Sequence, residues 1–237
     1  MGNIFNQVLI YPLLNLLVYM YQYIPDIGIV IILITILVRL VLLPSFHKSL
    51  KHQRELQKLQ PKMNEIKEKY KDDKEKQAAA MMELYKVHKV NPLSSCLPIL
   101  IQLPLLLALY QVFIRSLNGQ ELQGLYAFVQ NPGHMDPMFL NWINLSATGN
   151  YWLAAIAAIL QFVQTKMSQN KNSQSSDATT NMLNNYMMYF LPAMTFFLGV
   201  QFPAGLALYW VTTTVFGIAQ QYYILRREAN EALYGKQ

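Results

Sequence analysis

Residues 27–43, IGIVIILITILVRLVLL, form an apolar run long enough to cross a bilayer, which limits the chain to few kinds of fold. Only Thr35 and Arg39 within it are neither apolar nor small. As a helix the run would extend about 25 Å, close to the thickness of the hydrocarbon core. Pro44 follows it as a plausible stop signal. We therefore expect a first membrane span over residues 27–44.

Arg39 is unusual in such a segment, because a cation inside a bilayer costs about 3 kcal/mol or several times that amount. A chain keeps such a residue where water, a partner group or a function accompanies it. Alternatively, the side chain could extend to the interface, since a basic run starts nearby at His47. This segment alone leaves both interpretations open.

The composition indicates a polytopic membrane protein. The chain is 53% hydrophobic and only 14% charged, against about 25% charged residues in a soluble domain. Twelve of the nineteen Lys and Arg residues lie between Lys48 and Lys89, so the net charge of +6 does not indicate nucleic-acid binding. The single cysteine, Cys96, excludes an internal disulfide, and the four histidines show no metal-ligand spacing. We expect no enzyme activity, no cofactor and no metal.

The alternation of apolar and polar segments predicts an all-α polytopic membrane protein with five spans. The expected segments are an outer interfacial helix over 1–25, spans over 27–44, 97–115, 151–167, 184–200 and 202–225, a cytoplasmic helical hairpin over 45–90, an outer loop over 116–150, a cytoplasmic loop over 168–181 and a cytoplasmic tail over 226–237. The alternative for residues 1–25, which are apolar and rich in tyrosine, is a sixth span.

The hairpin prediction rests on a regular apolar spacing in the charged segment that follows the first span. The residues at this 3-4-3-4 spacing are Leu56, Leu59, Met63, Ile66 and Tyr70. A polar turn over 71–74 and a looser apolar stripe follow. Pro61 is expected to kink or restart the first arm. A solvated linker is the alternative, which the strict spacing disfavours.

The distribution of cations predicts the orientation. With five spans and the N-terminus outside, seventeen of the nineteen Lys and Arg residues belong to cytoplasmic segments and their edges. Arg39 and Arg115 are the two others. The opposite orientation would place nearly all cations outside, so we expect the C-terminus in the cytoplasm.

Polar residues of four predicted spans lie at a similar depth, about 15–18 Å below the outer surface. These are Arg39, Gln102, Gln161 and Thr214, with Thr35 and Trp210 one helical turn from Arg39 and Thr214. Each glutamine or threonine alone could simply join neighbouring helices. Their convergence with an arginine favours a water-filled cavity open to the cytoplasm. No acidic residue occurs in any predicted span, which disfavours a proton relay or cation transport.

Several separated motifs of the chain are similar to those of a known family. They are Leu59-Gln60-Pro61-Lys62, Asn91-Pro92-Leu93-Ser94-Ser95-Cys96-Leu97-Pro98, Gln102-Leu103-Pro104, Ala108-Leu109-Tyr110, Phe202-Pro203-Ala204-Gly205-Leu206-Ala207-Leu208-Tyr209-Trp210 and Gln220-Gln221. In order and spacing they resemble the Oxa/Alb/YidC family of membrane protein insertases, over about residues 4–228. Ser95 departs from the glycine that the family commonly has there, which changes nothing central.

The resemblance implies five core spans around a hydrophilic groove open to the cytoplasm and to lipid. It matches Arg39 to the groove arginine and, less directly, Gln102, Gln161, Trp210 and Thr214 to other groove residues. It implies a non-enzymatic insertase of the bacterial plasma membrane that works alone or with the Sec translocon. The expected partners are nascent membrane proteins, ribosomes carrying nascent chains, the Sec translocon and the lipid bilayer, with no small-molecule substrate. The large extracytoplasmic domain of some members is absent, so we expect a minimal core form.

Two other functions fit parts of the pattern. A small-solute transporter or channel would show inverted repeats with broken helices, and the sequence has no internal repeat. A coiled-coil membrane scaffold would need the apolar seam of the hairpin, but not the polar residues at one depth. The insertase accounts for both features.

Overall fold

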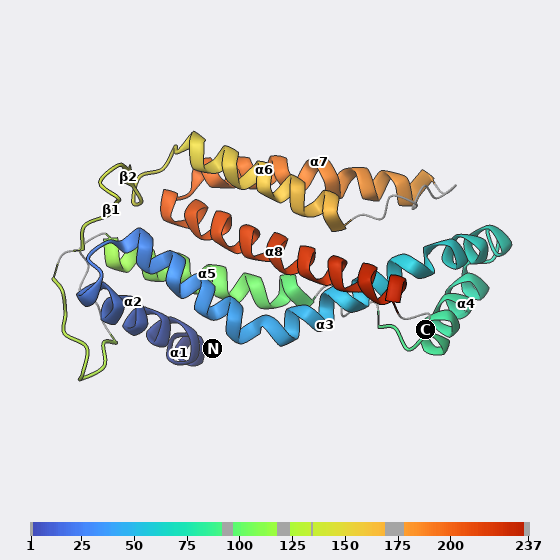
Figure 1. Ribbon diagram of the computed structural model, residues 1–237, viewed down its shortest axis with the longest axis horizontal. Coiled ribbons are helices and arrows are strands. Elements are labelled where there is room, and N and C mark those ends of the chain that lie inside the picture. Colours follow the sequence, from blue (N-terminus) through green and yellow to red (C-terminus); the bar gives the residue numbers. More distant parts are fainter. Residues whose placement is uncertain (1, 92–96, 118–123, 134, 169–177, 235–237) are drawn as a thin grey trace.

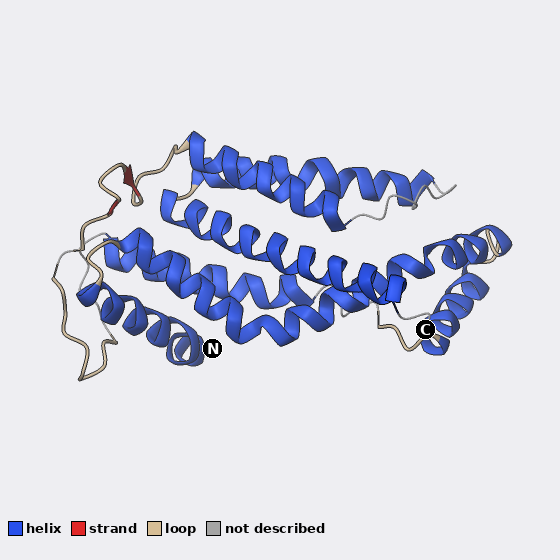
Figure 2. Ribbon diagram, in the orientation of Figure 1, coloured by secondary structure: helices blue, strands red, loops and turns tan. Residues whose placement is uncertain are grey.

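The computed structural model describes residues 2–91, 97–117, 124–133, 135–168 and 178–234, and most of them are helical (Figure 2). The elements are α1 (Gly2–Phe5), a π-helical turn η1 (Asn6–Ile10), α2 (Tyr11–Tyr23), α3 (Ile27–Lys69), α4 (Lys74–Val87), α5 (Leu97–Leu117), β1 (Met138–Phe139), β2 (Ile143–Asn144), α6 (Tyr151–Ser168), α7 (Ala178–Gln201) and α8 (Ala204–Tyr234).

The long helices run side by side along the long axis of the molecule (Figure 1). Helix α8 lies between the α6–α7 pair and α3, and it contacts α3, α5 and α6. Small residues allow close helix contacts here: a Cβ added at Gly199 of α7 would lie 3.0 Å from the Cβ of Ala154 in α6, and one at Gly217 of α8 would overlap Gln164. The bundle therefore places α8 where groups of several helices can meet.

Helix α3 is continuous over 43 residues, so Pro44 does not end it and Pro61 does not restart it, while the expected kink at Pro61 stays a prediction. A proline inside a helix lacks the N–H for the i−4 carbonyl and costs about 3 kcal/mol. Tertiary contacts after Pro44 offset this cost, because Phe46, Ser49 and Leu59 are all buried. The first span and the first arm of the expected hairpin are therefore one helix.

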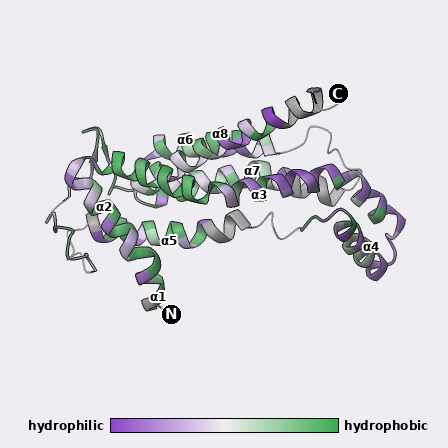
Figure 3. Ribbon diagram, turned by 60° about the horizontal axis from the view of Figure 1, so that its bottom comes forward, coloured by the Kyte–Doolittle hydropathy of each residue, from purple (hydrophilic) through white to green (hydrophobic). Residues whose placement is uncertain are grey.

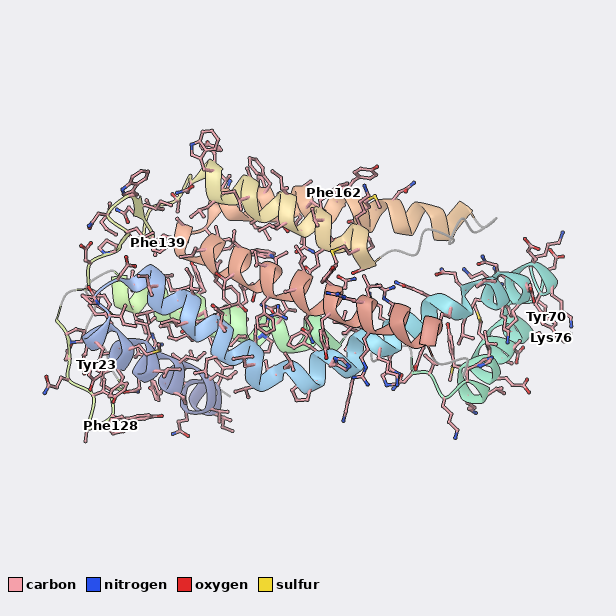
Figure 4. The ribbon with its side chains drawn as sticks, in the orientation of Figure 1. Tyr23, Tyr70, Lys76, Phe128, Phe139 and Phe162 are labelled. Carbon is pink, nitrogen blue, oxygen red and sulfur yellow. The ribbon has the colours of Figure 1, made fainter. Side chains whose placement is uncertain are left out.

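A tight turn joins α3 to α4, and Asp73 defines where α4 begins. Its carboxylate accepts a hydrogen bond from the backbone N–H of Lys76 at 3.0 Å, and the Lys76 ammonium lies 2.8 Å from its other oxygen. These contacts with Lys76 hold the pKa of Asp73 below its usual range. Tyr70 and Lys76 lie at this end of the molecule in Figure 4.

Helix α4 packs against the last part of α3. Gln77 Nε2 donates to the carbonyl of Lys67 at 3.3 Å, and the Tyr85 hydroxyl lies 4.0 Å from the sulfur of Met63. Tyr85 comes after Gln77 in α4, and its partner Met63 comes before Lys67 in α3. The two segments are therefore antiparallel (Figure 1).

The segment expected as an outer loop, 116–150, contains a small antiparallel ladder. Met138 of β1 pairs with Asn144 of β2, and Phe139 pairs with Ile143. Leu140, in the turn between them, has a positive φ of 50°. Two-residue strands of this kind are too short to be predicted from hydrophobic alternation.

Helix α2 is attached to the segment 124–133 through side chains. The buried Asn15 amide donates to the carbonyl of Gly124 at 2.8 Å and accepts from the N–H of Tyr126 at 2.7 Å. Gln22 Nε2 donates to the carbonyl of Gln130 at 2.9 Å. Tyr23 and Phe128 lie close to each other in Figure 4, at the end of the molecule opposite to Tyr70 and Lys76. Whether α2 lies in the membrane interface stays a prediction.

The bounds of the last helices differ from the expected ones. Helix α7 begins at Ala178, before the span expected over 184–200, and α8 continues to Tyr234, beyond the span expected over 202–225, and both spans stay predictions. Residues 169–177 of the expected 168–181 loop lie outside the described part of the chain. Within the described part, α3 alone is long and apolar enough to cross a membrane by length and composition, and a shorter apolar helical stretch covers Gln102–Val112.

Candidate functional site: a polar cluster around Arg39

Arg39 of α3 lies where three helices meet. Its Nε donates to the Thr213 hydroxyl of α8 at 3.2 Å, and its Nη2 donates to Gln102 Oε1 of α5 at 3.4 Å. Both bonds run sideways into the bundle. This geometry disagrees with an arginine that simply extends along α3 to the interface.

Gln102 links the arginine to a buried tyrosine. Its Nε2 donates to the hydroxyl of Tyr209, whose side chain is only 1% exposed. Tyr209 and Thr213 are four residues apart and therefore lie on one face of α8. Gln102 thus accepts from the arginine with its oxygen and donates to the tyrosine with its nitrogen, which fixes the orientation of its amide.

The ring of Phe46 covers the guanidinium of Arg39. The distance from Arg39 Cζ to the ring centroid is 4.5 Å, and Phe46 is 7% exposed. A cation over the face of an aromatic ring is attracted by the ring quadrupole. Phe46 is seven residues after Arg39 on the same continuous helix, which places it two turns further on the same face.

The groups contacting Arg39 in these interactions are neutral: a hydroxyl, an amide oxygen and an aromatic ring. A guanidinium has five N–H donors, and two of them are used in these two hydrogen bonds. Planar guanidinium edges bind carboxylates in a bidentate manner. The cluster therefore presents a partly buried positive charge, without a neutralising carboxylate from the predicted spans, that can bind an anionic group.

The other expected site residues lie differently. The hydroxyls of Thr35 and Thr214 are buried and donate to carbonyls of their own helices, at 2.6 and 2.8 Å. Trp210 and Gln161 are half-buried. Among the described residues, no hydrogen bond joins the Gln161 side chain to Arg39. The structure thus brings Arg39 and Gln102 together, and groove-lining roles for all six residues stay predictions.

Three residues of the cluster were missed by sequence reasoning: Phe46, Tyr209 and Thr213. The spacing of seven residues from Arg39 could have indicated Phe46, and the spacing of four between Tyr209 and Thr213 could have indicated the stripe that faces it. The choice of Thr214 failed to find this contact because depth along a helix does not fix the direction of a side chain. Neighbouring threonines in the run 212–214 point about 100° apart.

A second polar contact site joins α3, α6 and α8 further along the molecule. Arg54 Nη2 donates to the carbonyl of Met167 at 3.3 Å, and Gln57 Nε2 donates to the carbonyl of Ser168. Gln221 Nε2 of α8 donates to the Ser168 hydroxyl at 2.9 Å. The bonds from Arg54 and Gln57 satisfy carbonyls at the end of α6, which have no partner within the helix itself.

Comparisons with known proteins agree with one family. The model of the 60Kd inner membrane protein family matches residues 19–231. The chain is 38% identical to the membrane protein insertase YidC of Citrifermentans bemidjiense and 39% identical to that of Geotalea daltonii, and the matches cover 97% and 90% of this chain. They cover 40% and 36% of those relatives, so the chain spans well under half of their length.

A solved structure agrees in fold. It is described as an active YidC insertase crystal structure with the first transmembrane domain resolved, and its TM-score with this chain is 0.64 at 32% sequence identity. The match covers 92% of this chain and 46% of that one. Because the family model matches most of the sequence and the fold matches too, the chain belongs to the 60Kd inner membrane protein family, that is, to the Oxa/Alb/YidC family.

Proposed function

We propose that this protein inserts nascent integral membrane proteins into the bilayer from the cytoplasmic side and helps them to fold. The observation that carries the proposal is the arginine inside the bundle, which is held by neutral groups from α5 and α8. A charge that has no carboxylate partner among the residues of the predicted spans is costly, and function is the usual reason for retaining it. The YidC relatives are named membrane protein insertases, which supports the same conclusion.

The mechanism that fits this cluster is a local lowering of the free-energy barrier that a polar segment meets when it enters the bilayer. A hydrated groove around Arg39 would let the polar, often acidic, tail of a substrate move partway across the bilayer. The apolar part of the substrate would then enter lipid along the neighbouring helix faces. Leu37, Leu40 and Val41 of α3 are exposed at the level of Arg39 and point away from it around the helix, so an apolar surface lies on the other side of the helix that carries the charge.

The proposal includes the finer predictions from the sequence. Five spans would surround the groove, which Thr35, Gln161, Trp210 and Thr214 would help to line. The N-terminus would lie outside and the C-terminus in the cytoplasm of a bacterial cell. Nascent chains on ribosomes would be the substrates, delivered directly or together with the Sec translocon.

Insertion by the purified protein tests this function. Liposomes containing the protein are given a single-span reporter with a short translocated tail, and protection of the tail from protease is measured. Protein-free liposomes and liposomes with an unrelated five-span protein are the controls. We expect protection well above both controls, and protection equal to theirs would contradict an autonomous insertase.

A further inference from the structure

We propose that Phe46 is a positioning residue that holds the Arg39 guanidinium ready for an anionic segment of the substrate. The inference rests on the proposed function and assigns a role to the aromatic ring that covers the guanidinium. It starts from the 4.5 Å contact between Arg39 Cζ and the Phe46 ring.

Phe46 is well placed to fix the arginine because it is itself fixed. Its side chain is 7% exposed, and it lies on the same continuous helix as Arg39, two turns further on. A helix that ended at Pro44 would not give this alignment. The continuity of α3 through Pro44 therefore has a direct consequence for the site.

The chemistry of the contact suits a binding group that must stay available. An aromatic face stabilises the cation without accepting any of its five N–H donors. A carboxylate in the same place would neutralise the charge and occupy an edge of the guanidinium. Thr213 and Gln102 take one donor each, so the ring orients the plane while the remaining N–H groups stay available to a substrate carboxylate.

Removal of the ring should therefore leave the Arg39 charge in place but weaken its effect on the insertion of an acidic substrate. Phe46→Leu keeps an apolar side chain but removes the aromatic face. With a cation–π contact at a partly desolvated site, the insertion rate of an acidic-tailed reporter should fall roughly threefold, and by no more than the loss caused by Arg39→Ala. A matched reporter with a neutral tail should change less than about twofold. Phe46→Tyr, which keeps the ring, should remain near the wild-type rate for both reporters.

The experiment measures both reporters with liposomes containing wild type, Phe46→Leu, Phe46→Tyr, Arg39→Ala and the double variant Arg39→Ala/Phe46→Leu. In the Arg39→Ala background, Phe46→Leu should cause no further selective loss, because the ring would act through the guanidinium. Phe46→Met is the second non-aromatic variant if Phe46→Leu does not fold, as judged by its unfolding temperature in detergent.

Three results would overturn the positioning role: wild-type insertion of the acidic reporter by Phe46→Leu or Phe46→Met, equal loss for both reporters, or a further selective loss in the Arg39→Ala background. Each would assign Phe46 to packing alone. The two proposals fail separately. If Arg39→Ala inserts the acidic reporter normally, the charge mechanism is wrong. If Arg39→Ala is selective and the Phe46 variants are not, only the inference about Phe46 is wrong.

Discussion

Asp26 joins the start of α3 to the β1–β2 ladder through both oxygens of one carboxylate. Oδ1 accepts from the backbone N–H groups of Gly28 at 2.9 Å and Ile29 at 3.1 Å, as a helix N-cap does. Oδ2 accepts from the N–H of Leu140 at 2.7 Å. Leu140 has positive φ, a conformation that non-glycine residues adopt at a cost, so this bond also holds a strained turn.

Asp26→Ala should lower the free energy of unfolding by about 1 kcal/mol through loss of the cap, and by somewhat more if the turn also loosens. Asp26→Asn keeps one side-chain oxygen and should lower the free energy of unfolding by less. Thermal unfolding of the three proteins in detergent measures the difference. An Asp26→Ala protein as stable as wild type would show that the cap is dispensable.

The helices of the bundle could be predicted from the apolar segments of the sequence. The contacts between their side chains could not. Apolar runs are recognisable because burial or membrane contact requires them over many residues. The passage of α3 through Pro44 was not predictable, since the local cost of proline is overcome by contacts with distant residues. The contact of Arg39 with Thr213 was not predictable either, because it depends on the rotation of α8 about its axis.

At the scale of elements, the first arm of the expected hairpin is fastened to the bundle where α3 passes the end of α6. Arg54 and Gln57 donate to the carbonyls of Met167 and Ser168. Any motion of the expected hairpin relative to the spans therefore has to occur beyond Gln57 or break these bonds.

Arg54→Ala should destabilise this junction by about 1 kcal/mol, since it leaves a terminal carbonyl of α6 with a weaker partner. Lys58→Ala is the matched control, because Lys58 is exposed on the same helix one turn further on. Amide hydrogen exchange should become faster in the last turn of α6 for Arg54→Ala and stay unchanged for Lys58→Ala. Equal exchange in both variants would mean that the junction contributes no stability.

At the scale of the whole molecule, apolar and polar residues separate along the long axis. Hydrophilic residues are concentrated in α4 and the second half of α3, while the bundle is mainly hydrophobic (Figure 3). Two tryptophans at the other end of the molecule, Trp142 before β2 and Trp152 at the start of α6, are 90% and 85% exposed. Exposed tryptophans suit a membrane interface, and a cation-rich end suits the cytoplasm, so the distribution supports the proposed orientation.

This orientation predicts opposite labelling at the two ends. In a Cys96→Ser background, a cysteine at Lys71 should not react with a membrane-impermeant maleimide added to spheroplasts, and it should react once the membrane is opened. A cysteine at Asn141, which is exposed in the outer turn, should react without opening. Ready labelling at Lys71 in closed spheroplasts would reverse the topology.

The central claim is that the Arg39 charge draws acidic or polar substrate segments into the bundle. Arg39→Ala should fold, because the groups it leaves behind, Gln102, Thr213 and Phe46, are all neutral. Arg39→Lys keeps the charge and should retain much of the activity. A charge in a partly desolvated site acts at a lower effective dielectric constant than one at a surface, so its loss should slow the insertion of an acidic substrate strongly.

The most direct test compares insertion of two matched single-span reporters, one with an acidic tail and one with a neutral tail, by liposomes containing wild type, Arg39→Lys or Arg39→Ala. We expect Arg39→Ala to insert the acidic reporter about tenfold more slowly, equivalent to about 1.4 kcal/mol, and to affect the neutral reporter less. Insertion of the acidic reporter by Arg39→Ala at the wild-type rate would contradict the account and leave Arg39 with a structural role only.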